Sequence, residues 1–177
     1  MPCIYGSKKL ILWLPQVRIS IIFKCRPVEN EHKTGWYHMS SKLMEYFNKS
    51  PRIGTLSTAD NAGNVDAGVF GSPHMTDENT VVMGLGKNRT LANLRQNPHA
   101  MFLIMEPSAD FLDWKGIRVY LKAENIATIG PVFDTFRARM AKVAGEEAAE
   151  MIHAVVSFSV TEVRPLVDMG QGWEKSI

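Results

Sequence analysis

The chain has 177 residues, of which 45% are hydrophobic, so it can form one domain with a packed core. Its formal charge of +2 is unevenly distributed, because the first 38 residues carry six basic and two acidic side chains and the rest carry fourteen and sixteen. An acidic body excludes a basic nucleic-acid platform. Both cysteines, Cys3 and Cys25, lie in the first 38 residues, which excludes thiol catalysis, disulfides and thiolate metal sites from the body.

The first 38 residues differ from the rest of the chain in composition and in the pattern of their apolar residues. Their apolar run, Leu10–Leu14, ends at Pro15, and no stretch reaches the roughly 18–20 apolar residues that a membrane helix needs. The run is short for a signal peptide and has no small-residue cleavage pattern. The sequence from Met39 onward is typical of the start of a protein. We therefore interpret residues 1–38 as a dispensable extension that is translated from an upstream start, and residues 39–177 as a cytoplasmic domain. A weak membrane or partner anchor is the alternative.

The first half of the body alternates short helices and strands. The pattern predicts a helix over 41–49, capped by Ser40 or Ser41, and a strand over 53–58. A turn at 60–64 then leads into a return strand over 65–71.

A second turn at 77–79 leads into a strand over 80–85. A short helix with Leu91 and Leu94 at helical spacing follows and ends at Asn97-Pro98. The next predicted strand covers residues 100–105.

The second half contains the clearest strand of the chain, residues 117–124, in which apolar and polar side chains alternate. Pro131 opens a long helix, whose predicted buried stripe is Phe133, Phe136, Met140, Val143, Ala144, Ala148 and Met151. A last strand covers 154–163. Six antiparallel strands joined mostly by turns predict a mainly β fold, a small barrel with helices packed outside.

The segment Gly84–Thr90 is the strongest candidate for chemistry. Glycines allow a close backbone approach, Lys87 and Arg89 supply positive charge, and a helix N-terminus follows, a combination suited to a phosphate. An ordinary strand-to-helix turn with solvated basic residues is an equally good explanation of the spacing alone. The segment fits neither a Walker loop nor a Gly-x-Gly-x-x-Gly fingerprint, so another scaffold is implied.

The order of elements and three motifs resemble the FMN-binding split-barrel superfamily, which includes the pyridoxamine 5′-phosphate oxidases and small FMN-binding proteins. The motifs are Asn88–Leu94 followed by Asn97-Pro98, the hairpin return Asp66–Ser72, and Gly116–Glu124, within roughly residues 40–165. The resemblance implies a six-stranded antiparallel split β-barrel with Greek-key topology, an FMN cofactor, and a homodimer with two flavin sites at its interface.

The resemblance also implies which residues bind the flavin. Arg89 and Thr90 match the positions that hold the FMN phosphate, and the strand from Ala67 to Ser72 lines the isoalloxazine ring. The predicted cofactor-binding residues are Ala67, Gly68, Val69, Phe70, Gly71, Ser72, Gly84, Lys87, Asn88, Arg89, Thr90 and Trp114. Phe70 is either a ring contact or a core aromatic, and Trp114 either reaches the partner's flavin or packs locally.

The C-terminal segment departs from the family pattern. Full pyridoxamine-phosphate oxidases carry an Arg-rich C-terminal motif that binds the substrate phosphate, whereas only Arg164 and Lys175 are basic after Val163 here. We therefore expect a flavin-dependent oxidoreductase acting on an unknown small molecule, with NAD(P)H as a candidate reductant. The alternatives are a binding module for FMN, haem or a deazaflavin, and a pure dimerisation domain.

No catalytic residue can be assigned from the sequence. Flavin chemistry needs no general base from the protein. His74 and Tyr120 are possible proton donors, and each has a structural role as its alternative. The body histidines, His74, His99 and His153, show no metal-ligand spacing, so no metal site is predicted.

Overall fold

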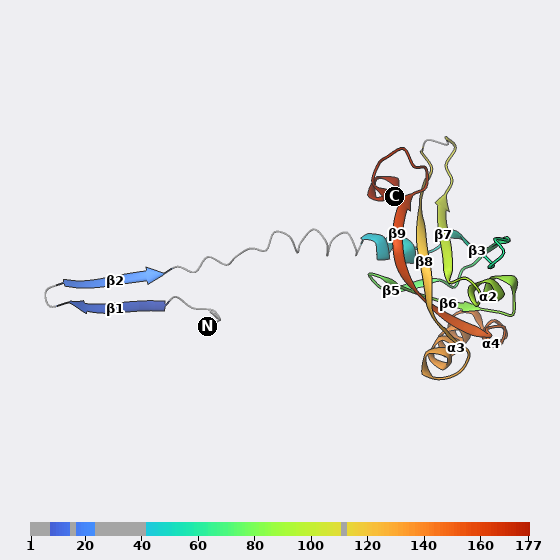
Figure 1. The fold of residues 1–177 in the computed structure, drawn as a ribbon, viewed down its shortest axis with the longest axis horizontal. Helices are drawn as coiled ribbons and strands as arrows, with labels where there is room; N and C mark the ends of the chain where they lie inside the picture. Colours follow the sequence, from blue (N-terminus) through green and yellow to red (C-terminus); the bar gives the residue numbers. More distant parts are fainter. Residues whose placement is uncertain (1–7, 15–16, 24–41, 111–112) are drawn as a thin grey trace. The chain divides into compact units, whose positions relative to one another are not determined.

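A computed structural model describes residues 8–14, 17–23, 42–110 and 113–177 (Figure 1). The chain divides into two compact units, Met1–Tyr37 and His38–Ile177. The first unit contains an antiparallel pair of strands, β1 (Lys8–Leu14) and β2 (Val17–Phe23). Our sequence analysis did not predict these strands, and the predicted start of the body at 39–41 lies outside the described residues.

The second unit is built on one antiparallel sheet of seven strands, in the order β4-β3-β7-β8-β9-β6-β5. This confirms the predicted class, a mainly β split-barrel fold with outer helices, but the sheet is open and has seven strands where six were expected. The additional strand is β5, which has only four residues. The strands are β3 (Ile53–Ala59), β4 (Val65–Val69), β5 (His74–Asp77), β6 (Thr80–Leu85), β7 (His99–Glu106), β8 (Lys115–Ala127) and β9 (Ala154–Pro165).

The long strand β8 follows the predicted alternation. Ile117, Val119 and Leu121 are buried and Arg118 points to the other face. Residues 42–48 form a helix whose Phe47 is fully buried, with its ring centroid 5.4 Å from that of Phe102. Burying a side chain of this size stabilises a fold by roughly 1.5–3 kcal/mol, so Phe47 anchors this helix to the main core.

Two helices, α3 (Pro131–Ala144) and α4 (Glu146–Glu150), lie at one end of β8 and β9, and the C-terminal segment lies at the other (Figure 1). The expected continuous helix through Met151 is wrong, because Gly145 (φ +92°) separates the two helices. The expected buried stripe is also partly wrong. Phe133 is buried, but Val143 and Met151 are 75% and 68% exposed.

The C-terminal segment ends in a short 3₁₀ helix, η2 (Trp173–Ser176). Together with Trp114, the tail around Trp173 is the part of the chain that we expect to reach a second subunit; within its own chain, partly buried Trp173 packs against the core. Within the described residues, no helix is both long enough and apolar enough to cross a membrane.

Candidate functional site

The helix α2 (Arg89–Leu94) begins at the predicted phosphate segment. Asn88 is its N-cap, as expected, and its side-chain oxygen accepts a hydrogen bond from the Leu91 N–H at 2.9 Å. Leu91 and Leu94 are buried, which fixes the helix on the core. We call Lys87, Asn88 and Arg89 the basic loop, and all three of its residues are exposed.

Two side-chain hydrogen bonds join α2 to the sheet. The Thr90 hydroxyl donates to the Asp66 carboxylate at 3.2 Å, and the Asn93 amide donates to the Thr58 hydroxyl oxygen at 3.1 Å. Thr58 and Asp66 are register partners on β3 and β4. The basic loop and the hairpin return, two of the three motifs, are therefore neighbours in space.

The basic loop can bind an anion. In residues 42–110 and 113–177, none of the ion pairs involves Lys87 or Arg89. An arginine offers a planar set of N–H donors that matches phosphate oxygens, and a lysine adds a compact charge. Thr90 differs from the expected phosphate ligand, because it is only 2% exposed and its hydroxyl already has Asp66 as a partner.

Strand β4 lies at one edge of the sheet and exposes Val65, Ala67 and Val69. A side chain on Gly71 would meet nothing within 4 Å, whereas one on Gly68 would approach the Phe70 ring at 2.9 Å. Gly71 and Ala67 thus leave the backbone accessible, as a flat ring lying against it would require, whereas the Phe70 ring fills the space beside Gly68. Phe70 packs against the main core, which favours its structural interpretation.

The space beside Gly84 is filled by neighbouring side chains. A Cβ there would lie 2.6 Å from the Phe136 ring and 3.2 Å from Ile152, so the glycine allows α3 to approach β6. The Gly84 carbonyl accepts a hydrogen bond from the Ser72 hydroxyl at 3.1 Å. Ser72 and Gly84 therefore lie together, and they lie next to α3.

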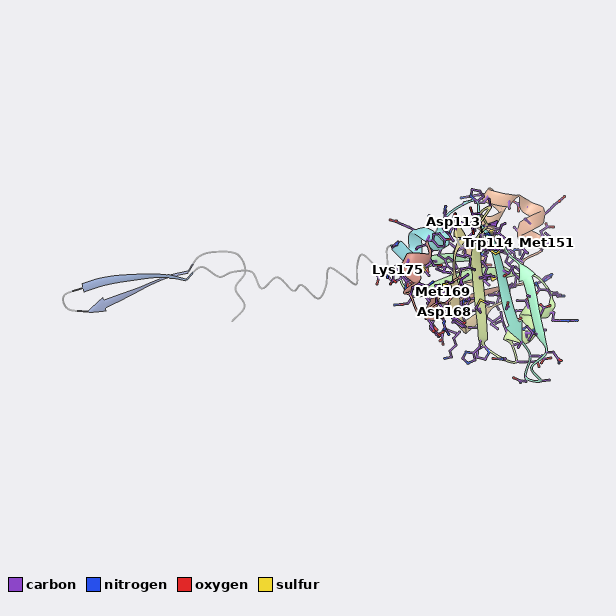
Figure 2. All side chains as sticks on the ribbon, turned by 90° about the horizontal axis from the view of Figure 1, so that it is seen from above. Asp113, Trp114, Met151, Asp168, Met169 and Lys175 are labelled. Carbon is purple, nitrogen blue, oxygen red and sulfur yellow. The ribbon has the colours of Figure 1, made fainter. Side chains whose placement is uncertain are left out.

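Trp114 does not join the basic loop within one chain. The register pairs His99 with Lys122 and Glu106 with Lys115, so Trp114 lies at the opposite end of β7 and β8 from α2. Trp114 is labelled in Figure 2. Its indole N–H donates to the Ser108 carbonyl at 2.9 Å, and its side chain is half-buried. A flavin contact from Trp114 could come only from a second subunit.

Two of the cavities that adjoin α3 share lining residues, and the sequence analysis missed both. Their volumes are about 390 and 400 Å³, within the usual range for small-ligand sites, and both are lined by His74, Phe136 and Arg139. The second is also lined by Arg52, and by Gly71 and Ser72 from the hairpin return. We call them the α3 cavities; none of the basic loop's residues lines either one.

The α3 cavities have a cationic wall. Burial, and then the charges of Arg139 and Arg52, lower the pKa of His74 below its ordinary value. Arg52 donates to the carbonyls of Phe47 and Pro73, and burial lowers its own pKa. Among the described residues no carboxylate forms an ion pair with Arg52 or Arg139. A lowered pKa leaves His74 neutral near pH 7, which suits accepting a proton better than donating one.

The remaining predicted residues lie elsewhere. Tyr120 is half-buried on β8, opposite Glu162, and lines neither α3 cavity. Arg164 is paired with Asp168 and Glu162, so it is not a free cation for a substrate. In the described part of the chain, no three His, Cys, Asp or Glu side chains gather as metal ligands would.

A seven-stranded antiparallel sheet with outer helices, and with a basic loop beside the β3–β4 hairpin, defines the split-barrel class. Residues 40–166 match the pyridoxamine 5′-phosphate oxidase family, and the chain belongs to that family. No curated protein sequence matches the chain.

Solved structures support the fold. An FMN-binding protein from Syntrophomonas wolfei is 22% identical, with a TM-score of 0.62, over 80% of this chain and 97% of that protein. HupZ from Group A Streptococcus is 18% identical, with a TM-score of 0.56, over 69% and 90%. HutZ, a haem storage protein from Vibrio cholerae, is 14% identical, with a TM-score of 0.53, over 69% and 91%. At these identities the likeness shows the fold alone.

Proposed function

We propose that this protein is an FMN-binding flavoprotein of the cytoplasm, a homodimeric oxidoreductase that acts on a small anionic molecule. The observation that carries the proposal is the basic loop, whose Lys87 and Arg89 have no ion-pair partner in the described residues and lie next to β4. Family membership and the FMN-binding neighbour support it.

The residues present fit FMN at both ends of the molecule. Cations without an ion-pair partner in the described part of the chain suit a phosphate. Gly71, which has open space around it, and the exposed Ala67 suit a flat ring against the backbone. When bound, the flavin supplies the redox chemistry, and the protein supplies binding and tuning. Lys87 and Arg89 would hold the phosphate, while Thr90 would hold α2 to Asp66.

The α3 cavities are the proposed place for the substrate. Arg139 in both cavities, joined by Arg52 in the second, would attract a carboxylate or phosphate group. The Phe136 ring, joined by Val82 in the first cavity, offers an apolar wall for the rest of the molecule. Neutral His74 could accept a proton released there. Because Gly71 and Ser72 border the second cavity, substrate and flavin would meet at the end of the hairpin return.

A second subunit would complete the flavin site. One side of β3, β4 and β7 forms an apolar face in which Ile53, Val65 and Val69 are 51%, 72% and 75% exposed. The register places half-buried Met101, Leu103 and Met105 on the same face. Exposed apolar surfaces of this kind mark interfaces, and an isologous dimer would bury two copies of this one.

Flavin titrations test the proposal. FMN and riboflavin are titrated by fluorescence against the wild type, Arg89→Ala, and the control Arg95→Ala, which removes an exposed arginine from the C-terminal end of α2. Losing a charge-assisted contact should weaken the binding of FMN about ten- to a hundredfold and leave the affinity for riboflavin unchanged. If Arg89→Ala binds FMN as tightly as the wild type, the phosphate assignment is wrong.

A binding module without catalysis is the second candidate, because one structural neighbour is a haem storage protein. The visible spectrum of the purified protein distinguishes the two cofactors, because flavin absorbs at about 450 nm and haem gives a Soret band. Reduction of the bound flavin by NADH or NADPH would support the oxidoreductase. A colourless protein that ignores added FMN would instead support a dimerisation domain.

A further inference from the structure

Four polar side chains connect α2 to the sheet at two points, and we call them the polar lock: Thr58, Asp66, Thr90 and Asn93. Thr90 and Asn93 are three residues apart, so they share one face of α2. Their partners, Asp66 and Thr58, are paired across β3 and β4. Thr58, Thr90 and Asn93 are at most 4% exposed, so water does not compete strongly for these bonds.

An acidic side chain is an unfavourable neighbour for a phosphate site. Asp66 is half-buried, and the described ion pairs do not include it. Its carboxylate would repel the anion that Lys87 and Arg89 attract. The one partner that the structure shows for the Asp66 side chain on α2 is the Thr90 hydroxyl, which gives the residue a structural reason to be present.

We propose that Asp66 is a positioning residue for the basic loop: by holding Thr90 through the polar lock, it orients Lys87 and Arg89 for a phosphate. Thr90 directly follows Arg89, so the hydroxyl bond fixes the backbone from which both cations extend. A loop that is ordered before binding loses less conformational freedom when the ligand arrives. This inference rests on the proposed function, since it assigns a phosphate to the loop.

The test compares the affinities of FMN and riboflavin, whose ratio isolates the phosphate. Asp66→Ala removes both the acceptor and the repelling charge; the loss of the acceptor should dominate and lower that ratio by up to about tenfold, the equivalent of one hydrogen bond. Asp66→Asn keeps an acceptor and removes the negative charge, so it should keep at least the wild-type ratio. Thr90→Ser keeps the hydroxyl and should retain the ratio, whereas Thr90→Val should lower it as Asp66→Ala does.

Folding is monitored by the urea midpoint, and each variant is titrated only where it is fully folded. A second arm, hydrogen exchange of the α2 amides without ligand, should show faster exchange in Asp66→Ala and Thr90→Val, and wild-type rates in Asp66→Asn and Thr90→Ser. This arm remains decisive even where a variant binds no flavin.

Two results would overturn the inference. If Thr90→Val lowers the ratio while Asp66→Ala does not, Thr90 contacts the phosphate directly. If the α2 amides exchange at wild-type rates in Asp66→Ala, the carboxylate does not order the helix. A wild-type protein with equal affinity for FMN and riboflavin would instead contradict the proposed function, and the exchange experiment would still judge the polar lock.

Discussion

The side-chain amide of Asn48 pairs with both backbone polar groups of Met75. Its nitrogen donates to the Met75 carbonyl at 2.9 Å, and its oxygen accepts from the Met75 N–H at 2.9 Å. Asn48 ends the helix over 42–48, and Met75 lies on the edge strand β5. The amide thus acts as a short substitute for a neighbouring strand.

Asn48→Ala should therefore destabilise the fold. The substitution leaves two part-buried backbone groups of Met75 without these partners, which costs about 1–3 kcal/mol. Urea unfolding measures the loss, with Glu45→Ala as the control because Glu45 is exposed on the same helix. Equal stabilities of the two variants would show that water replaces the amide at no cost.

Gly54→Ala should be destabilising for a different reason. A Cβ on Gly54 would lie 2.3 Å from Cζ of Phe102, a fully buried ring that packs against Phe47. Overpacking of this kind typically costs about 1–3 kcal/mol. Gly71→Ala is the matched control, because a Cβ there meets nothing within 4 Å. Similar urea midpoints for both variants would contradict the packing argument.

Local signals in the sequence predicted the elements that depend on local chemistry. The turn at 60–64 forms because the Asp60 carboxylate accepts the N–H groups of Ala62 and Asn64, at 2.9 Å each. The alternation of apolar and polar side chains in β8 and the Asn88 cap of α2 were also predictable, because each depends on residues close in the chain.

Features that depend on tertiary packing were not predictable. Strand β5 is short and has no alternating pattern of its own, because Asn48 and β6 hold it in place. The second α3 cavity combines Arg52, His74 and Arg139, which lie far apart in the sequence, and of these the sequence analysis singled out only His74. Periodicity could not show that Val143 faces solvent, because it records which residues share a face and not what covers that face.

Stability should fall as the pH drops below about 6.5, the ordinary histidine pKa, because of His74. Its pKa is lowered in the folded state, so the unfolded chain takes up the proton first and is favoured through the window between the two pKa values. The wild type should therefore lose stability relative to His74→Gln between pH 8 and pH 5. Arg139→Gln removes one of the causes and should weaken the effect. Identical pH dependence for the wild type and His74→Gln would contradict this assignment.

A chain that starts at Met39 should fold, dimerise and bind FMN with the affinity of the full chain. The body has its own core, and the first 37 residues form a separate compact unit. Thermal unfolding, light scattering and FMN titration on both chains test the prediction. Loss of folding or of flavin binding on truncation would show that residues 1–38 are structural.

Dimerisation should depend on the apolar face of β3, β4 and β7. Val65 on this face and Val143 on α3 are similarly exposed, at 72% and 75%, so they form a matched pair. Val65→Glu would introduce a buried, unpaired charge into the interface and should shift the dimer towards monomer, whereas Val143→Glu should leave it unchanged.

Light scattering over a range of concentrations measures the dissociation of both variants, and FMN titration then reports whether the flavin site needs the second subunit. We expect Val65→Glu to lose most of its FMN affinity together with the dimer, because the apolar wall opposite β4 would come from the partner. A Val65→Glu protein that stays dimeric while Val143→Glu dissociates would place the interface on α3. A monomer that binds FMN at full affinity would show that one chain forms the whole site.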